Sequence, residues 1–547
     1  MRALLFISNI FFAHILISII IYIFFGKYDV LSPIYLAKNF LFSNNNNQTV
    51  NLIFFFYIFL IALPAIILSI IESYKKSPNR KNKYGYAGFI KSARKIKKMG
   101  FNFENGLVFG KFKRNLFSRS RLIRTSEPLS TLVIAPPGTG KTAGIVIPTV
   151  LKLRNSMIIH DPKGEIHHNT ADTRKKMGYK VMVFDISDKN SIKFNPFAIN
   201  KIPKEADLIK SYIVNIANII FKISDKDDNK DYFIGAAKNT FVTIACYLIY
   251  KNGWTSITKI RSKLLEDDDI ISTFGKMKNE PQESFPLLIK KDKLLKKLIE
   301  DINSVLIASA SDEQWAGVMG SLSKELDYFA DNQIEHIIDC KKSSFTANQL
   351  RKEDVSIYLK VKDEDRAKLK VVISMIFESM GTELISNPVE KGDNQITFIL
   401  DEFVRLGKVN FLSELSAISR GYNLNQMFVI QDYEQISNTY SKEYMSILSS
   451  NCAYKILFKQ NSLNTAKIIS ETIGNKTDYR VSKSEKELDL LTTNKNMSDS
   501  LSVSQEGLAL VTAQDILNLP KNKCLIITQG FAARPVLANI AWYFKGL

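Results

Sequence analysis

The first feature of the sequence is a pair of long apolar runs. Residues 4–25 and 50–71 each extend over 22 positions without an Asp, Glu, Lys or Arg. A helix rises about 1.5 Å per residue, so each run would span about 33 Å and cross a hydrocarbon core of about 30 Å. The pattern therefore predicts two transmembrane helices, which form a membrane anchor over residues 1–73.

After residue 125 the pattern changes to short apolar runs that are separated by polar turns and by segments of helical period. We predict buried strands at 131–135, 156–162, 180–185, 355–361, 395–400 and 427–430. Strands that alternate with helices are typical of an α/β fold with a doubly wound, mostly parallel sheet. The sequence therefore predicts such a sheet as the centre of the main domain.

A long stretch of helical period interrupts these strands. Its clearest helical segments are 206–221, 234–250 and 287–302. We therefore expect an inserted all-α domain at 206–330, which divides the α/β domain into residues 126–205 and 331–547. A second interruption, at 475–505, is polar and rich in Lys, Ser and Asn. Its composition favours a mobile loop, with a pore or subunit contact as the alternative.

The distribution of charge distinguishes a further region, directly after the second apolar run. The 547 residues carry a net charge of +20, and residues 72–125 alone contain 16 Lys or Arg and two acidic residues. Basic residues that follow the second apolar run place both chain termini in the cytoplasm. The basic juxtamembrane segment, 74–125, fits contact with anionic lipid, and a nucleic-acid path near the membrane is the alternative. We therefore expect a multi-pass membrane protein.

The four cysteines indicate a reducing environment. Cys246, Cys340, Cys452 and Cys524 are far apart and form no CxxC pair. This spacing argues against a zinc site and against a disulfide framework. It agrees with a cytoplasmic location for the chain beyond the second apolar run.

The apolar run 131–135 leads into a Gly-rich loop that has the pattern of a Walker A motif. The loop consists of Ala135, Pro136, Pro137, Gly138, Thr139, Gly140, Lys141 and Thr142. Gly138 and Gly140 let backbone N–H groups close around phosphate oxygens, and Lys141 reaches the β- and γ-phosphates. Thr142 supplies a hydroxyl to Mg²⁺. Ala135 stands where Gly is usual, and we expect the loop to tolerate this small residue. The cofactors predicted here are ATP and Mg²⁺.

A second apolar run, 395–400, ends in two acidic residues and has the pattern of a Walker B motif. Asp401 would hold Mg²⁺, and Glu402 would polarise the attacking water. An apolar run followed by acidic residues is common on its own. Together with the Walker A loop it predicts a site for nucleotide hydrolysis.

These motifs occur in a specific order along nearly the whole chain. Between the Walker loops lie Asp-Pro-Lys-Gly-Glu at 161–165, Phe-Asn-Pro-Phe at 194–197 and the helical stretch. Asp401 and Glu402 are followed by Phe403, and then come Ser-Arg-Gly-Tyr at 419–422 and Val-Ile-Gln-Asp at 429–432. With the two N-terminal apolar runs and the basic segment, this set resembles the type IV secretion coupling proteins, the TraG/TraD-type ATPases of conjugation and effector export.

The resemblance implies a RecA-like P-loop NTPase domain with an inserted all-α domain, preceded by two transmembrane helices. It also implies a homo-hexamer in which each nucleotide lies between two subunits. Arg420 matches the family's arginine finger, which acts on the neighbouring subunit, and Gln431 matches a γ-phosphate sensor. The catalytic residues implied are thus Lys141, Glu402, Arg420 and Gln431. The all-α domain would be the part that reads the substrate.

The function that this implies is an inner-membrane ATPase that delivers substrates to a type IV secretion channel. Its expected partners are other components of the secretion system, membrane lipids, and effector proteins or DNA with its relaxase. The motifs leave two alternatives open: a nucleotide-binding docking receptor without motor activity, and an FtsK-like DNA translocase. A membrane-bound protease of the AAA class would need a zinc-binding HExxH motif, which is absent from the sequence.

Overall fold

The computed structural model describes residues 84–113, 119–221, 228–267, 269–362, 364–407, 409–484 and 500–546. All of these belong to one compact unit, Tyr84–Leu547. The two predicted transmembrane helices, at 4–25 and 50–71, lie outside the described residues. Among the described residues, one helical stretch, Tyr232–Asn252, is long and apolar enough to cross a membrane. However, 56% of its most apolar part is buried inside the protein. The core helix of a globular domain has these same properties.

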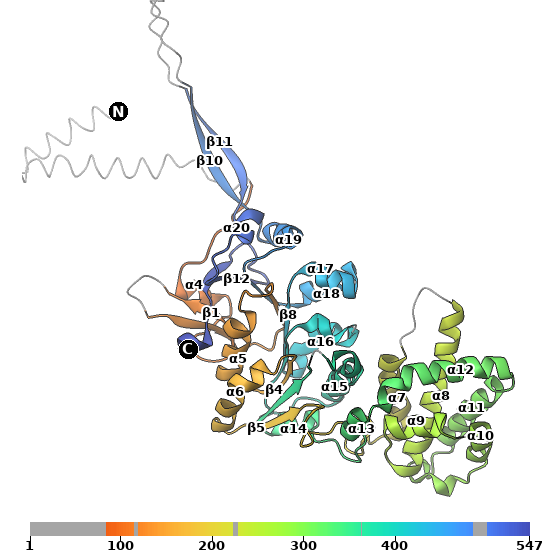
Figure 1. The fold of residues 1–547 in the computed structure, drawn as a ribbon. Helices are drawn as coiled ribbons and strands as arrows, with labels where there is room; N and C mark the ends of the chain where they lie inside the picture. The colour runs from red at the N-terminus through yellow and green to blue at the C-terminus, as the bar shows by residue number, and fades with distance from the viewer. Residues whose placement is uncertain are drawn as a thin grey trace, which may run out of the picture. The chain divides into compact units, whose positions relative to one another are not determined.

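The centre of the unit is an 11-stranded sheet (Figure 1) with the order β2-β1-β13-β12-β9-β3-β8-β7-β4-β6-β5. The seven strands from β9 to β5 are parallel: β9 Tyr454–Leu457, β3 Thr131–Ile134, β8 Leu424–Ile430, β7 Ile396–Leu400, β4 Ser156–Asp161, β6 Val355–Lys360 and β5 Lys180–Phe184. Four strands extend the sheet with antiparallel pairing: β12 Lys523–Thr528, β13 Val536–Asn539, β1 Leu107–Phe112 and β2 Arg121–Thr125. The predicted strands and the mostly parallel sheet are confirmed.

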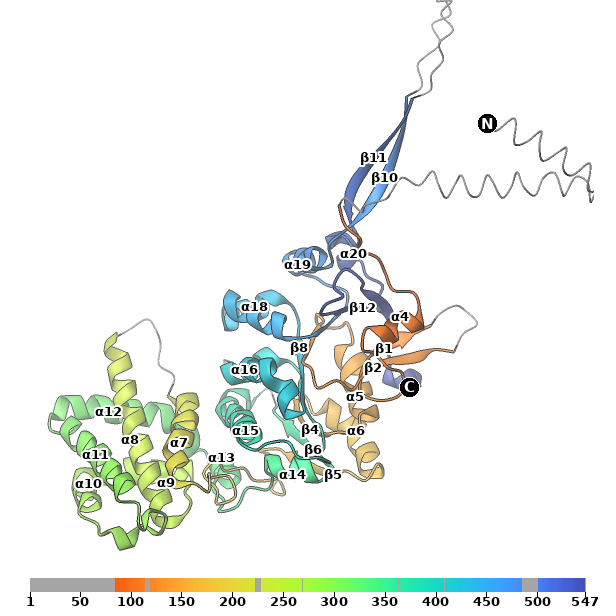
Figure 2. The same ribbon diagram turned by 180° about the vertical axis from the view of Figure 1, so that it is seen from behind.

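Helices cover both faces of the sheet because successive strand residues point to opposite sides. In β3, Leu132 and Ile134 enter one apolar cluster and Val133 enters the other. Figures 1 and 2 show α5, Ile147–Lys152, and α6, Glu165–Lys176, on one face, with α15, Arg366–Ser386, and α16, Asn410–Ile418, on the other. The remaining helices of this domain are α4 Ala93–Lys98, α14 Ala347–Lys352, α17 Tyr433–Thr439, α18 Lys442–Asn451, α19 Leu463–Ile473 and α20 Ala513–Leu517.

A buried arginine joins α6 to the sheet. The guanidinium of Arg174 donates hydrogen bonds to Ser356 Oγ at 2.9 Å, to the carbonyl of Leu153 at 2.5 Å and to the carbonyl of Asn155 at 2.7 Å. Its side chain is fully buried and lies 3.4 Å from the centre of the Tyr179 ring. These contacts connect the end of α6 with β6 and with the turn before β4.

Seven α-helices occupy the stretch from Ala206 to Ile338 within the described residues, and α14 follows them before β6. They are α7 Ala206–Ile220, α8 Asp228–Asn252, α9 Ile257–Leu265, α10 Ile270–Lys278, α11 Asp292–Ala308, α12 Asp312–Leu326 and α13 Asn332–Ile338. Helix α8 is central, since it packs against α7, α11 and α12. Most buried apolar side chains of this part lie on its helices.

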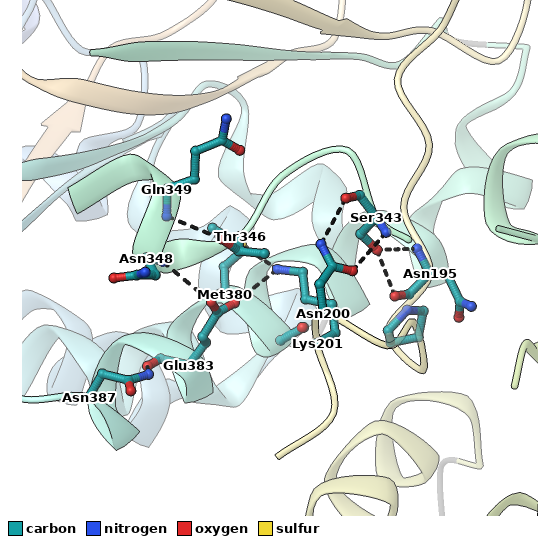
Figure 3. A network of polar contacts seen from close by, with 12 residues as sticks. Asn195, Asn200, Lys201, Ser343, Thr346, Asn348, Gln349, Met380, Glu383 and Asn387 are labelled. Carbon is teal, nitrogen blue, oxygen red and sulfur yellow. Dashed lines mark hydrogen bonds and ion pairs between the residues drawn. The ribbon is translucent and has the colours of Figure 1, made fainter. Parts of the chain in front are cut away.

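The two chain segments that enter and leave these helices are hydrogen-bonded to each other (Figure 3) through Asn195 and Ser343. The Asn195 amide N–H donates to Ser343 Oγ at 2.9 Å, and Ser343 Oγ–H donates to the Asn195 carbonyl at 2.8 Å. The Asn195 side chain donates to the carbonyls of Thr255 and Cys340 at 2.6 and 2.8 Å. The Phe-Asn-Pro-Phe motif at 194–197 therefore has a structural role at this junction.

The same junction contains a buried ion pair. Lys201 Nζ lies 3.0 Å from Glu383 Oε2 on α15, also drawn in Figure 3, and only 1% of the lysine side chain is exposed. The ammonium also lies over the rings of Phe194 and Phe345, 5.6 and 5.4 Å from their centres. Burial lowers the pKa of Lys201, and the carboxylate of Glu383 opposes this shift. The pair connects the entry segment to a helix of the α/β domain.

The polar segment 475–505 is only partly described, and the mobile loop expected there is wrong for the described part. Residues Asn475–Ser484 and Ser500–Ala509 form β10 and β11, which pair in antiparallel register as a separate two-stranded ribbon. Tyr86 bridges to Lys476, so the segment after residue 83 lies along the base of β10. The sequence analysis missed these strands because most of their residues are polar and no continuous apolar run marks them.

We predict that replacing Arg174 by Met lowers the free energy of unfolding by at least about 3 kcal/mol. Three buried acceptors would lose their hydrogen-bond donor, and each unpaired group costs about 1–3 kcal/mol. Thermal unfolding of the full chain in detergent, compared with Lys175→Met at the exposed neighbouring position, measures the effect. Equal melting temperatures for the two variants would contradict it.

Candidate nucleotide-binding site

The Walker motifs meet at one edge of the parallel sheet. In the register of the parallel strands, Ile134 of β3 lies beside Ile430 of β8, Leu400 of β7 beside Phe428 of β8, and His160 of β4 beside Leu400. The carboxyl ends of these strands are therefore adjacent. Open α/β sheets bind ligands at this edge, which also carries the loops that follow the strands.

The loop after β3 has the conformation that its glycines allow. Gly138 and Gly140 have φ values of +75° and +81°, in the left-handed region that favours glycine. Thr139 returns to the start of the loop, because its amide N–H and its hydroxyl both donate to the carbonyl of Pro136, at 3.3 and 2.6 Å. Ala135 is fully buried in an apolar cluster, and its N–H donates to the Ile430 carbonyl at 2.9 Å. Its methyl group thus fits where Gly is usual.

The helix after the loop begins with a π-helical turn, Thr142–Val146, and continues as α5. This turn presents Lys141 and Thr142 to the acidic pair after β7. Thr142 Oγ1 donates to Asp401 Oδ2 at 3.1 Å, and Lys141 Nζ lies 3.8 Å from Asp401 Oδ1. Lys141 Nζ also lies 3.7 Å from Glu402 Oε1. The four polar residues that the two motifs predict therefore form one cluster.

The chemistry of this cluster fits Mg²⁺. A threonine hydroxyl and a carboxylate are the hard oxygen ligands that Mg²⁺ prefers, and phosphate and water usually complete its coordination. Burial raises the pKa of Asp401, while the ammonium of Lys141 opposes this shift. Among the described residues no group of three or more His, Cys, Asp or Glu could hold a metal by itself. Thr142 and Asp401 are the residues that would hold the ion beside a phosphate.

Glu402 has an unusual backbone and a cationic environment. Its φ of +51° lies in the left-handed region, and 9% of its side chain is exposed. Lys163 Nζ lies 3.5 Å from Glu402 Oε1, and Arg405 pairs with Glu402 Oε2. Together with Lys141, three cationic side chains therefore contact the carboxylate of Glu402. Lys163 belongs to the 161–165 motif, which this contact joins to the site.

Asp161 of the same motif has a different role. Its carboxylate accepts a hydrogen bond of 2.8 Å from the amide N–H of His167 in the first turn of α6. Burial raises the pKa of Asp161 to about 6, and the N–H groups of His167 and Ile166 oppose this shift. The side chain satisfies free N–H groups at the helix start, which is turn chemistry.

His160 is a residue of the site that the sequence analysis missed. Its Nδ1 donates a hydrogen bond of 2.7 Å to the carbonyl of Asp401, so the imidazole supports the peptide between the two acidic residues. His160 is buried near the carboxyl end of β4, and burial lowers its pKa to about 4. A histidine at the end of an apolar run, directly before the charged motif at 161–165, was the only signal for it.

The structure separates the two residues that the family resemblance adds. Gln431 directly follows β8 at the same edge as the Walker loop, and its N–H donates to Gln435 Oε1 at 3.3 Å. Arg420 lies in the turn Ser419–Tyr422 before β8, at the opposite edge of the sheet, and is exposed. Seven residues of β8 separate the two edges by about 23 Å. Arg420 is therefore not part of the cluster in its own subunit.

The parallel sheet, the Gly-rich loop after β3 and the acidic pair after β7 define an α/β P-loop NTPase fold. Residues 81–546 match the family model described as "Type IV secretory system Conjugative DNA transfer". The chain belongs to this family, so the resemblance found in its motifs is confirmed.

Curated relatives agree with this assignment. The chain is 25% identical over 449 residues to Protein VirD4 of Rhizobium radiobacter, an alignment that covers 81% of this chain and 60% of that protein. It is 23% identical over 380 residues to Conjugal transfer protein TraG of Escherichia coli, covering 65% and 56% of the two chains. The alignments thus span about 60% of the length of these relatives.

Solved structures share the fold. The unbound coupling protein TrwBdeltaN70 has a TM-score of 0.62 and 15% sequence identity, with 84% of this chain and 94% of that chain covered. TrwB in complex with the ATP analogue ADPNP has a TM-score of 0.59, and TrwB in complex with ADP and Mg²⁺ has one of 0.57, each at 15% identity and 84% coverage of this chain. At this identity the likeness shows the fold alone.

We predict that His160 makes the stability of this domain sensitive to acid. A histidine with a folded pKa of about 4 and an unfolded pKa near 6.5 takes up its proton mainly on unfolding. Its contribution to stability is therefore present above pH 6.5 and is lost as the pH falls towards 4. Asp161 has the opposite effect: because its pKa is raised to about 6 in the folded state, its contribution to stability grows as the pH falls from about 6 to about 4.

The His160→Asn variant separates the two groups. The asparagine side chain can still donate a hydrogen bond to Asp401 but does not titrate. Between pH 7 and pH 5 the melting temperature of the wild type should fall more than that of His160→Asn. Identical pH profiles would show that His160 does not carry this dependence.

Proposed function

We propose that this chain is a membrane-anchored ATPase that delivers macromolecular substrates to a type IV secretion channel. The observation that carries this proposal is the convergence of Lys141, Thr142, Asp401 and Glu402 at one edge of a P-loop NTPase sheet. Membership in the conjugative DNA-transfer family gives the chemistry its context.

Each residue of the cluster has a distinct task in hydrolysis. The loop from Ala135 to Thr142 binds the phosphates through backbone N–H groups, and Lys141 neutralises charge on the β- and γ-phosphates. Mg²⁺ held by Thr142 and Asp401 would neutralise developing charge on the phosphate oxygens. Glu402 orients and polarises the attacking water, while Lys163 and Arg405 restrain its carboxylate before nucleotide arrives. Gln431, at the end of β8, senses the γ-phosphate.

Arg420 acts on a neighbouring subunit of a homo-hexamer. Its exposed position at the edge of the sheet opposite the cluster supports action in trans. A guanidinium that reaches the neighbour's γ-phosphate neutralises charge in the transition state, an effect worth about 10³–10⁵ in rate in comparable enzymes. Hydrolysis would then depend on assembly of the ring.

The proposal also covers the membrane location of the chain and its partners. The runs at 4–25 and 50–71 anchor the chain in the bacterial inner membrane, with both termini in the cytoplasm. The helices between Ala206 and Ile338 receive the substrate, which is an effector protein, DNA with its relaxase, or both. Other secretion-system components take over the substrate, and lipid contacts the basic segment 74–125.

We predict that Lys141→Ala abolishes ATP turnover of the assembled protein, whereas Glu402→Gln lowers kcat at least about 100-fold and leaves ATP binding intact. The first variant loses phosphate contacts, and the second loses only the group that activates water. Turnover and nucleotide binding of the purified full chain in detergent test both statements. Equal turnover for wild type and Lys141→Ala would favour the docking receptor without motor activity.

A mixing experiment tests the role of Arg420. Arg420→Ala and Lys141→Ala subunits should each be inactive alone, and a mixed ring should regain activity where an intact Lys141 site faces an intact Arg420. We expect a maximum of turnover at intermediate ratios, measured after the two variants are co-assembled. Absence of recovery at every ratio, with mixed rings confirmed by differently tagged subunits, would contradict action in trans.

A further inference from the structure

The last described residues of the chain lie at the nucleotide edge of the sheet. Strand β9 is parallel to β3, β12 is antiparallel to β9, and β13 is antiparallel to β12. Strand β13 therefore runs in the same direction as β3, and the residues after Asn539 emerge at the edge that carries the Walker A loop. This closing segment, residues 540–546, contains Trp542, Tyr543 and Phe544.

Two side chains of the closing segment contact the Walker A region closely. A Cβ atom added to Gly140 would lie 2.3 Å from the Trp542 ring, and one added to Gly144 would lie 2.3 Å from Ile540 Cγ2. Neither position has room for any side chain larger than hydrogen. The indole ring therefore lies directly against the last glycine of the loop, next to Lys141. Ile540 fills the corresponding space one turn further along the helix.

A third contact joins the closing segment to the motif that supplies Lys163. Tyr543 Oη donates a hydrogen bond of 2.9 Å to Asn169 Oδ1 on α6, and Asn169 Nδ2 donates to the Glu165 carbonyl at 2.8 Å. Glu165 begins α6 directly after the turn that contains Lys163. One short segment thus contacts both of the chain regions that provide lysines to the acidic pair.

We propose that Trp542 is a positioning residue for the Walker A loop: its indole ring packs against Gly140 and holds the loop in its phosphate-binding conformation. The proposal rests on the nucleotide-binding function proposed above and extends it to a residue outside the Walker motifs.

The physical reason lies in the freedom of glycine. Gly138 and Gly140 can populate many backbone conformations, and ordering them costs conformational entropy when phosphate binds. A rigid ring against Gly140 removes alternatives before the ligand arrives, so less of the binding free energy is spent on ordering the loop. Without the ring a cavity would remain beside the loop, and the loop would sample conformations in which its N–H groups diverge.

The test compares nucleotide affinity in three variants of the full chain in detergent. Trp542→Ala should raise the Kd for a fluorescent ADP analogue with Mg²⁺ about tenfold, while Trp542→Phe, which keeps a flat ring, should raise it less than about threefold. In ATP turnover, Trp542→Ala should raise KM and leave kcat within about threefold, since Glu402 and Asp401 are untouched.

Phe531→Ala is the matched control. Phe531 is also a partly exposed aromatic residue, but it precedes β13 and so lies at the opposite edge of the sheet. Its Kd should equal that of the wild type. Wild-type affinity in Trp542→Ala, or equal weakening by Phe531→Ala, would overturn the proposal. Absence of binding by the wild type itself would instead overturn the proposed function.

A second measurement keeps Trp542 in place and therefore does not depend on how its variants fold. The chain has three tryptophans; Trp254 lies in the loop between α8 and α9, and Trp315 lies in α12. In the Trp254→Phe, Trp315→Phe background the remaining emission comes from Trp542 alone. Addition of ADP and Mg²⁺ should shift or quench this emission, with Lys141→Ala in the same background as the negative control. Unchanged emission at saturating nucleotide would overturn the proposal.

Discussion

Parallel pairing of the central strands is the constraint on which the rest of the structure depends. Because β3, β8, β7 and β4 run in the same direction and in register, the loops that follow them emerge at one edge. Lys141 and Glu402 are 261 positions apart in the chain, yet their charged atoms lie 3.7 Å from each other. A change of strand direction would move either group to the opposite edge, which is where Arg420 lies. The helices between β5 and β6 can be long without disturbing this arrangement, since they lie outside the pairing.

The candidate site concentrates opposite charges in a partly buried space. Asp401 and Glu402 face Lys141, Lys163 and Arg405, and a neutral histidine supports the peptide that joins the two acids. In a partly buried space of low dielectric these ion pairs are strong. If a lysine or arginine moves away from Asp401 or Glu402, another cation must take its place, because an unpaired buried carboxylate is unfavourable. Mg²⁺ and the phosphate groups would bring both signs of charge together. The ion pairs within the cluster thus balance its buried charges, and the same residues suit a ligand that carries both signs of charge.

The sequence predicted the centre of this molecule well and its periphery less well. Strands such as β3, β4 and β7 are continuous apolar runs because both of their faces are buried, so their pattern is unambiguous. The Walker residues are recognisable because their chemistry requires specific residue types at specific spacing. The strands β10 and β11 consist mostly of polar residues and therefore contain no continuous apolar run. His160 and Trp542 could not be placed from sequence, because each acts through a partner that is distant in the chain. The domain boundaries and the roles of the site residues stay predictions.

The junction at Asn195 and Ser343 has a consequence for how such a chain can change over time. The segments that enter and leave the helices between β5 and β6 are held together by reciprocal hydrogen bonds, so the intervening chain closes a loop whose ends already meet. The entropy of closing a loop between fixed ends grows only slowly with its length. Helices can therefore be lengthened, removed or exchanged between these two points at small cost to the sheet. The junction therefore allows the helical part to change during evolution while the sheet and the edge that carries the Walker motifs stay the same.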